Sequence, residues 1–333
     1  MTEKTLSIPS AFNYELLSDE LKIDLQETLE HVKNAVSEKS RKEYGSSFRA
    51  FEVWCKKENL DALPAHPLAV AAFLTHENRK GLKLRTLQLR LAAISFYHRE
   101  SNLENPTSHE IVQKALKGIK RQWIKKDEEE LRLPKAKEAL TIDKLEAMLL
   151  CVDASTLTGL RDRALLMLGF AGAFRESELV ALRVSDLKFE VQGLKIRIRK
   201  SKTDQEGKGK VKPILSGERL FPVDYLRAWL HAAKINESYL FRKVNKGGRT
   251  IGVTALSERS VDTIVKKYAA LAGLHSEDYA GHSLRSGFTS SAAKLGKKRH
   301  KVKSVTGQSS DAAYERYVQD VELFEDHAAE GMY

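Results

Sequence analysis

The chain has 333 residues, of which 42% are hydrophobic and 30% are charged, a composition typical of a globular protein with two domains. Because no run of about 18 apolar residues occurs and the N-terminus "MTEKTLSIPS" lacks an apolar signal-peptide core, the sequence indicates neither a membrane span nor secretion and favours a cytoplasmic protein. The net charge of +11 and the pI near 9.4 favour an anionic partner such as nucleic acid, although a basic protein without such a partner would show the same balance.

The N-terminal half has helical periodicity and no strand pattern. Apolar side chains recur at i, i+4, i+7 and i+11 in one stretch, which predicts a helix with a single buried face. The residues of that face are Tyr44, Phe48, Phe51 and Cys55. A second stripe within residues 82–100 consists of Leu87, Leu91 and Ile94, and the polar residues Arg85, Gln88 and Arg90 point away from it. We therefore predict an all-helical domain over residues 20–127.

Residues 124–140 are rich in charge and lack apolar periodicity, which predicts an interdomain linker, with the domain boundaries placed at residues 128–134. Thr141 is expected to cap the first helix of a second domain, residues 135–333. There "GLKIRIRK" alternates apolar and basic residues, which predicts a half-buried strand. A glycine-containing turn, "SKTDQEGKGK", precedes a partner strand, "VKPIL", and helices are expected from there to the end.

The two cysteines, Cys55 and Cys151, lie far apart and lack metal-ligand spacing. They indicate reduced, packed thiols of an intracellular protein. No acidic cluster and no His/Cys set predicts a metal, and no motif predicts a cofactor.

Two pairs of polar residues stand at helical spacing in this second domain. In "AFRESELVALRVSDL", Arg175 and Glu178 are at i and i+3 on one face of a predicted helix, where a plain surface ion pair is the simpler interpretation. In "GHSLRSGFTSSAAKLG", His282 and Arg285 have the same spacing directly after a glycine at a helix start, where free N–H groups favour an anion. A capping histidine beside a solvated arginine is the alternative there.

Four further side chains complete the set of candidates. Lys202 follows the predicted strand on an exposed turn, where lysines are usually surface residues. Tyr314 and Tyr317 lie in the stretch "TGQSSDAAYERYVQD", with Gln308 just after a glycine. Tyr314 fits an apolar helical stripe, whereas Tyr317 sits one turn further on, beside Arg316; a core or interface tyrosine is the ordinary reading of either.

Taken together, these residues suit attack on a phosphodiester. Guanidinium groups bind phosphate oxygens in bidentate fashion and stabilise the extra negative charge of the transition state. A tyrosine oxygen can displace a DNA hydroxyl and hold the strand covalently. A lysine can protonate the departing 5′-oxygen. This chemistry can proceed without a metal.

At this point the chain resembles a known family, the tyrosine recombinases, close to the Cre type and to bacterial integrases that lack an arm-binding domain. The resemblance covers roughly residues 35–325. Its motifs are "RESEL", "SKTD", "HSLR" and "TGQSSDAAYERYV", in that order, with about thirty-five residues from "HSLR" to the tyrosine. The stretch "RTLQLRLAAISFYHRES" is also similar to a DNA-contacting helix of the Cre-type N-terminal domain.

The resemblance implies a role for each candidate. Arg175, Arg285, His282 and Gln308 would grip the scissile phosphate, Glu178 would orient Arg175 or His282, and Lys202 would protonate the leaving 5′-oxygen. Tyr317 lies about nine residues after the Gly307–Gln308 step, where the family has its nucleophile, while Tyr314 falls at a packing position. Gln308 departs from the His or Trp usual there; its amide can still donate a hydrogen bond but cannot carry a proton. Contacts to DNA from the N-terminal domain would come from Arg41, Lys42, Arg49, Arg85, Thr86, Gln88 and Arg90.

The implied architecture is mainly α with a small β-sheet in the C-terminal domain: a DNA clamp made of a helical core-binding domain and a mixed α+β catalytic domain. The implied partner is double-stranded DNA with an inverted-repeat site, bound by a homotetramer. Strand exchange would proceed through a Holliday junction and would need no ATP. The tail "VELFEDHAAEGMY" has one apolar helical face, at Val321, Phe324 and Ala328, and would dock on a neighbouring subunit or on its own domain. Two alternatives stay open: an enzyme like a type IB topoisomerase, and a sequence-specific DNA-binding protein whose catalysis is impaired.

Overall fold

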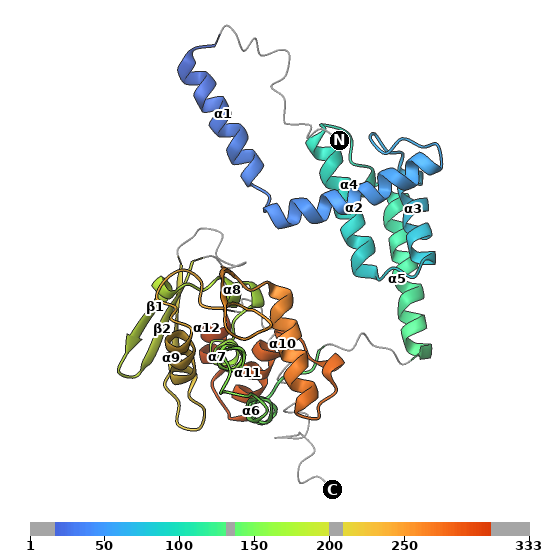
Figure 1. Cartoon of the computed structure of the whole chain (residues 1–333). Helices are drawn as coiled ribbons and strands as arrows, with labels where there is room; N and C mark the ends of the chain where they lie inside the picture. Colours follow the sequence, from blue (N-terminus) through green and yellow to red (C-terminus); the bar gives the residue numbers. More distant parts are fainter. Residues whose placement is uncertain (1–16, 131–136, 200–208, 308–333) are drawn as a thin grey trace. The chain divides into compact units, whose positions relative to one another are not determined.

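The computed structural model describes residues 17–130, 137–199 and 209–307 of the chain (Figure 1). The chain separates into two compact units, Met1–Leu133 and Pro134–Tyr333, and each has its own hydrophobic core. Both units are mainly helical, and the described strands form small antiparallel sheets in the second. The predicted fold class, mainly α with a small amount of sheet in the C-terminal half, is confirmed.

The N-terminal unit is built from helices alone within its described residues. These are α1 (Asp19–Asn34), α2 (Glu38–Lys57), α3 (Pro67–Arg79), α4 (Leu84–Glu100), the short 3-10 turn η2 (Pro106–Ser108) and α5 (Glu110–Glu130). Helix α2 packs against α4, and α3 packs against α5. The unit therefore buries one apolar stripe of each of these four helices.

The predicted apolar face of α2 lies in the core. Phe48, Phe51 and Cys55 are buried, and Tyr44 is half-buried at the edge of the same cluster. The Phe48 ring stacks on Tyr97 of α4 with 4.2 Å between centroids. Burying a side chain of this size stabilises the fold by about 2–3 kcal/mol, so the aromatic contacts hold α2 to α4.

Helix α5 is longer than the sequence pattern indicated. It runs to Glu130 and so takes in the first seven residues of the charged stretch 124–140 that was predicted to be a linker. Lys and Glu are good helix formers, so a helix can continue without an apolar stripe. The stretch predicted to be an interdomain linker therefore begins as helix as far as Glu130, and residues 131–136 lie outside the described part.

His98, on α4, is a buried polar residue that the sequence analysis did not single out. Its Nε2 accepts a hydrogen bond from the Ala65 amide at 2.9 Å, and its Nδ1 lies 2.8 Å from the Ile94 carbonyl oxygen, to which it donates. The bond from Ala65 requires the neutral ring, because a protonated Nε2 cannot accept. Burial lowers the pKa of His98, because the charged form is disfavoured away from water, and the bond to Ile94 offsets this only in part.

Acidification below pH 6.5 is therefore expected to destabilise the N-terminal unit. The folded chain takes up this proton less readily than the unfolded chain, so the free energy of unfolding falls as the pH drops below the ordinary histidine pKa of about 6.5. Because a single proton is involved, the free energy of unfolding changes by at most about 1.4 kcal/mol per pH unit. Calorimetry of the full chain between pH 7.5 and about pH 5, with His98→Gln as a control that cannot be protonated, measures it. Equal pH slopes in the two proteins would contradict the assignment.

The C-terminal unit mixes helices with short strands. Its helices are α6 (Ile142–Leu150), α7 (Leu157–Ala171), α8 (Glu176–Ala181), α9 (Pro222–Ala232), α10 (Glu258–Leu271), α11 (His282–Lys294) and α12 (Arg299–Thr306), with 3-10 turns η3 (Val184–Asp186) and η4 (Ser276–Asp278). Its strands are β1 (Leu187–Glu190), β2 (Gly193–Ile198), β3 (Lys210–Leu215), β4 (Arg242–Val244) and β5 (Ile251–Ala255).

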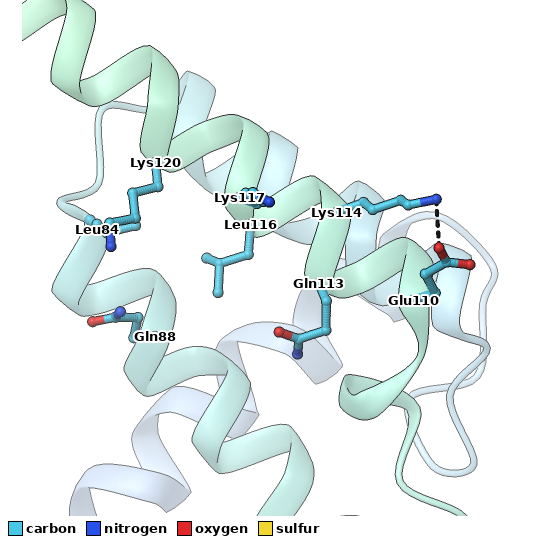
Figure 2. Close-up of a pocket in the computed structure, with 8 residues that line it drawn as sticks. All are labelled: Leu84, Gln88, Glu110, Gln113, Lys114, Leu116, Lys117 and Lys120. Atoms are coloured by element: carbon cyan, nitrogen blue, oxygen red, sulfur yellow. Dashed lines mark ion pairs between the residues drawn. The ribbon is translucent and has the colours of Figure 1, made fainter.

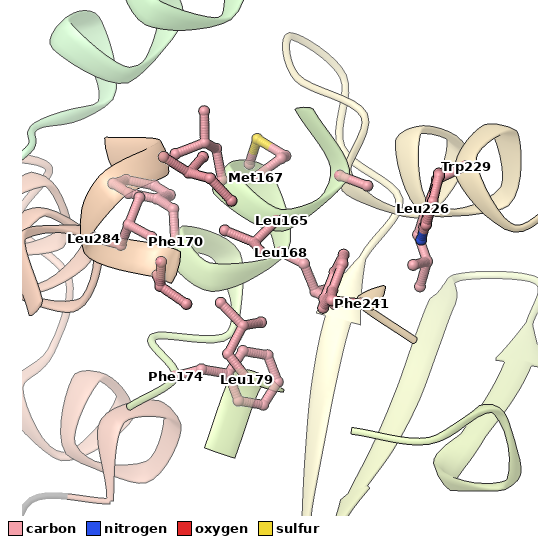
Figure 3. Close-up of a cluster of buried hydrophobic side chains, with 14 of the residues drawn as sticks. Leu165, Met167, Leu168, Phe170, Phe174, Leu179, Leu226, Trp229, Phe241 and Leu284 are labelled. Carbon is pink, nitrogen blue, oxygen red and sulfur yellow. The ribbon is translucent and has the colours of Figure 1, made fainter. Parts of the chain in front are cut away.

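Helix α7 forms the centre of this unit. It is apolar on nearly all sides and packs against α9 and α11, as a helix surrounded by protein must (Figure 3). Figure 3 shows Leu165, Leu168 and Phe170 of α7 among side chains from α8, α9 and α11. The fully buried Trp229 of α9 donates its indole N–H to the Leu240 carbonyl at 2.8 Å. This core supports the ends of α7, α8 and α11, where the candidate site residues lie.

The predicted hairpin is present, and the pairing of its strands gives their register. Strand β2 alternates buried and exposed residues as expected, and it pairs antiparallel with β1 and β3. In β3 the apolar pattern fails: Val211 faces outward with 55% of its surface exposed, while Lys212, opposite Ile196, is only 3% exposed. A lysine thus occupies an inward position where the strand pattern calls for an apolar residue.

Strands β4 and β5 correct the expectation that only helices follow the first hairpin. They pair antiparallel through Val244 and Ile251, on either side of the turn "NKGG". Each strand is too short to show a clear alternation of apolar and polar residues, so only the turn sequence could have indicated this hairpin.

Residues 137–142 lie along α11. The Leu140 amide donates to the Ser283 carbonyl at 3.0 Å, and the Ile142 amide donates to the Ser291 hydroxyl at 2.9 Å. A Cβ on Gly287 would lie 1.8 Å from the Leu140 carbonyl oxygen, so this close approach requires glycine. Thr141 is the residue before α6 as predicted, but its side chain makes no capping hydrogen bond.

Candidate active site

Arg175 and Glu178 meet at the start of α8. Arg175 is the N-cap residue, with extended backbone, and not a residue of the helix as the spacing suggested. Its guanidinium donates to the Glu178 carboxylate at 2.6 Å, and its backbone amide donates to the other carboxylate oxygen at 3.2 Å. Glu178 is buried, whereas the Arg175 side chain keeps 24% of its surface exposed. The pair therefore holds a guanidinium that keeps part of its surface in contact with solvent.

His282 and Arg285 lie in the first turn of α11, as predicted. The helix can begin beside α8 because Gly281 has no side chain: a Cβ there would come within 2.6 Å of Glu176. Arg285 is only 2% exposed and donates from Nη1 to the Ala173 carbonyl at 2.7 Å. That carbonyl precedes Arg175 by two residues, so the structure brings the two arginines of separate motifs to one place.

The environment of His282 disfavours its charged form. Although the residue has solvent access, loss of water around the imidazole lowers its pKa, and the nearby charges of Arg285 and Arg175 lower it further. At neutral pH the ring is therefore uncharged, with one donor and one acceptor nitrogen. An arriving anion would favour its protonation.

Lys212 is a member of this cluster that the sequence analysis missed. Its ammonium lies 3.8 Å from the Glu178 carboxylate and donates to the Gly172 carbonyl at 2.7 Å. Burial lowers the pKa of Lys212 to about 7 against the attraction of Glu178, with help from Arg285. Burial would raise the pKa of Glu178, but Lys212 and the bonds from Arg175 outweigh it and lower that pKa.

Lys210 approaches the same cluster from the beginning of β3. Its ammonium donates to the Ser304 carbonyl near the end of α12 at 2.6 Å. Burial and the charge of Arg285 lower the pKa of Lys210, with Glu178 opposing them. Helix α12 then ends in the left-handed residue Gly307, with φ of 67°. The hydrogen bond therefore ties the hairpin to the chain just before Gln308.

Four candidate site residues lie outside the described residues: Lys202, Gln308, Tyr314 and Tyr317. The predicted apolar face of the tail, Val321, Phe324 and Ala328, lies outside them as well. Their roles stay predictions. The described flanks are Arg199 and Gly209 for the segment with Lys202, and Gly307 for the segment with both tyrosines.

The residues predicted to contact DNA from the N-terminal unit occupy different environments. Arg49, Arg85 and Gln88 are exposed, and Arg41 and Thr86 are half-buried. Lys42 is exposed and forms an ion pair with Glu38 at 2.6 Å.

Arg90 differs from the expectation that it points away from the core. It donates to the Ser47 carbonyl at 3.1 Å and lies 3.4 Å from the buried carboxylate of Glu77. It therefore ties α4 to α2 and α3, which leaves it poorly placed to reach DNA.

A shallow groove between α4 and α5 carries several polar and basic side chains (Figure 2). Its lining residues are Leu84, Gln88, Glu110, Gln113, Lys114, Leu116, Lys117 and Lys120. Lys114 pairs with Glu110 at 2.6 Å, while Gln88 is one of the predicted DNA contacts. The groove belongs to the N-terminal unit and so adds a basic surface next to exposed residues of α4.

Within residues 17–130, 137–199 and 209–307, no three His, Cys, Asp or Glu side chains gather in a way that could hold a metal ion. No helix of this described part is long and apolar enough to cross a membrane.

Comparison with known proteins identifies the family of the chain. Residues 138–322, more than half of the chain, match the phage integrase family. The chain belongs to this family. The resemblance drawn from the ordered motifs is thereby confirmed, and the family places the protein among the tyrosine recombinases, enzymes that transfer DNA strands.

Relatives of this integrase-family chain span most of its length. An integrase/recombinase described as a XerD homologue, from Selenomonas ruminantium, is 33% identical over 307 residues, which are 91% of this chain and 87% of that protein. Recombinase cre of Escherichia phage P1 is 25% identical over 295 residues, or 84% of this chain and 83% of that protein.

Solved structures of similar fold include DNA-bound recombinases. A lambda integrase dimer bound to a COC′ core site has a TM-score of 0.58 and 17% identity, covering 91% of this chain and 78% of that chain. The XerH site-specific recombinase bound to a palindromic difH substrate has a TM-score of 0.53 and 20% identity, covering 78% of this chain and 70% of that chain. At these identities the likeness concerns the fold alone.

Proposed function

We propose that this chain is a site-specific DNA recombinase that cleaves and rejoins strands through a 3′-phosphotyrosine bond at Tyr317. The observation that carries the proposal is the meeting of Arg175 and Arg285 around one short turn, with His282 beside them. Together with Lys210 these groups outnumber the carboxylate of Glu178, and the excess positive charge favours an anion such as a phosphate. Such donors stabilise the charge that develops when a tyrosine attacks a phosphodiester.

The proposed reaction conserves a phosphodiester bond at each step. The Tyr317 hydroxyl gives its proton to solvent as its oxygen attacks phosphorus, the bond to the 5′-oxygen breaks, and Lys202 gives that oxygen a proton. The 5′-hydroxyl of a partner strand then attacks the phosphotyrosine and releases the tyrosine. Because the bond energy is retained in the protein–DNA link, no ATP is needed.

Double-stranded DNA with an inverted-repeat site is the proposed partner. The exposed residues Arg49, Arg85 and Gln88, with the lysines of the α4–α5 groove, offer the N-terminal unit's surface for the duplex. Most of the affinity would come from such phosphate contacts and would fall with salt. Two rounds of exchange would pass through a Holliday junction in a homotetramer, linked by the C-terminal tail in trans. Sedimentation of the protein on full and half sites measures this stoichiometry.

Covalent trapping tests the proposed activity. Duplexes selected for specific binding from a random pool are rebuilt with a nick in the spacer, so that the short 5′-hydroxyl fragment diffuses away after cleavage. The expected result is a protein–DNA adduct that survives detergent and carries the DNA on Tyr317 by mass spectrometry. Specific binding without an adduct would support the DNA-binding alternative, and relaxation of any supercoiled plasmid without site preference would support a topoisomerase.

The general acid can be assigned with sulfur at the bridging 5′-position of the scissile phosphate. A thiolate leaves without protonation, so this substrate is expected to restore cleavage to Lys202→Ala to within about tenfold of the wild-type rate. Lys210→Ala is the control, because the Lys210 ammonium is engaged by the Ser304 carbonyl. Rescue of the Lys210 variant in place of the Lys202 variant would move the role along the hairpin.

A further inference from the structure

The turn between α7 and α8 sets the position of Arg175, the N-cap residue of α8. It consists of Gly172, Ala173 and Phe174, and Ala173 adopts a left-handed conformation with φ of 44°. For a residue with a side chain, this conformation costs about 1–2 kcal/mol. Such a turn persists only where surrounding contacts hold it. The Phe174 ring packs directly over Gly172, at a place that a Cβ would occupy.

Lys212, on strand β3, makes contacts that hold this turn. Its ammonium donates to the Gly172 carbonyl at 2.7 Å and to the Ala173 carbonyl at 3.3 Å. It also lies 4.6 Å from the centroid of the Phe174 ring. Arg285 donates to the same Ala173 carbonyl from the other side of the site, at 2.7 Å. One short turn thus joins Lys212 and Arg285 and leads directly into Arg175.

An apolar residue would be the ordinary choice at position 212. The side chain lies opposite Ile196 on the inward face of the sheet, and burying an ammonium costs free energy that a leucine or methionine would avoid. Glu178 does not require Lys212 as its partner, because Arg175 already bonds to both of its oxygens at 2.6 and 3.2 Å. The hydrogen bonds to the turn are therefore what the lysine adds.

We propose that Lys212 is a positioning residue for strand cleavage: it holds the Gly172–Phe174 turn, and through that turn keeps Arg175 and Arg285 in the geometry that grips the scissile phosphate. This inference rests on the proposed recombinase function. Lys212 itself does not touch DNA, since it is buried under the turn. Loss of Lys212 is therefore expected to lower the rate of cleavage and to leave the affinity for the DNA site unchanged.

The test compares Lys212→Met, Lys212→Arg and the control Lys195→Met in the full chain. Methionine keeps most of the lysine's volume and loses its donors, arginine keeps donors that can reach the carbonyls, and Lys195 is exposed on the neighbouring strand β2. At saturating nicked DNA we expect Lys212→Met to cleave about 10- to 100-fold more slowly, because small misplacements of catalytic groups have effects of this size. Its dissociation constant for the DNA site is expected to stay within about threefold of the wild-type value.

Lys212→Arg is expected to recover most of the rate, and Lys195→Met to match the wild type. Cleavage by Lys212→Met within about twofold of the wild type, equal losses in the Met and Arg variants, or a loss of affinity as large as the loss of rate would each overturn the proposal. Amide hydrogen exchange of residues 172–176 without DNA gives an independent readout and should quicken only in Lys212→Met. If the wild type formed no adduct, the recombinase function would fail while this exchange measurement still decided whether Lys212 holds the turn.

Discussion

Replacing Tyr317 with phenylalanine is expected to abolish the covalent protein–DNA adduct and leave DNA binding intact. The change removes only the phenolic oxygen, which is the atom proposed to form the bond to phosphorus. Without this oxygen no covalent bond to the DNA can form, so no adduct should be detectable. Trapping on nicked DNA followed by denaturing electrophoresis measures the adduct, and gel shifts on the same duplex measure binding.

Tyr314→Phe is the matched control, three residues away in the same stretch. It loses the same atom at the position assigned to packing and is expected to keep cleavage within about threefold of the wild type, as a surface or packing hydroxyl would allow. An adduct that persisted in the Tyr317 variant and disappeared in the Tyr314 variant would exchange the two roles. An adduct in both variants would require another nucleophile.

Substitution of either arginine of the cluster is expected to slow cleavage by about 10²–10³-fold, as removal of one donor to a transition-state oxyanion does. Binding should fall much less, since affinity is spread over many phosphate contacts. Arg175→Ala removes the half-exposed guanidinium held by Glu178, and Arg285→Ala removes the buried one bonded to Ala173. Single-turnover cleavage at saturating DNA measures the rate.

Arg285→Ala could also loosen the fold, because the side chain is only 2% exposed. Arg285→Lys, which keeps the charge but not the planar fork, separates the two effects and should still cleave slowly at an unchanged melting temperature. Arg259→Ala, an exposed arginine of α10, is the control and is expected to change neither rate nor affinity. A loss that lay mainly in binding would make either arginine an ordinary phosphate contact.

Much of the helical architecture could be predicted because its signal is local. The spacing of Phe48, Phe51 and Cys55 is a property of α2 alone, and the alternation in β2 is a property of one strand, so both were recovered. The ordered motifs likewise identified Arg175, His282 and Arg285, which the fold brings together. That Arg175 caps α8 and does not lie inside it follows from the left-handed turn before it, which no spacing rule reveals.

The features that could not be predicted depend on contacts between distant segments. Lys212 looked like one basic residue among several on a hairpin, and only the register with Ile196 turns it inward. Arg90 was expected on the polar face of its helix, but a buried carboxylate, Glu77, draws it inward. Helix α5 extends beyond its apolar stripe through Lys and Glu residues, which are good helix formers.

The buried lysine has a consequence for laboratory evolution. Because folding lowers the pKa of Lys212 to about 7, well below the value of a free lysine near 10.5, the unfolded chain holds this proton more tightly. The resulting destabilisation grows as the pH falls from about 10 towards 7. Replacing a whole buried ion pair by apolar residues is often neutral or stabilising, and Glu178 keeps Arg175 as its partner when Lys212 is replaced. A screen of this protein for heat resistance near pH 7 is therefore expected to enrich Lys212→Met, whose gain in melting temperature shrinks as the pH rises, and so to select robust proteins with a poorly held Arg175.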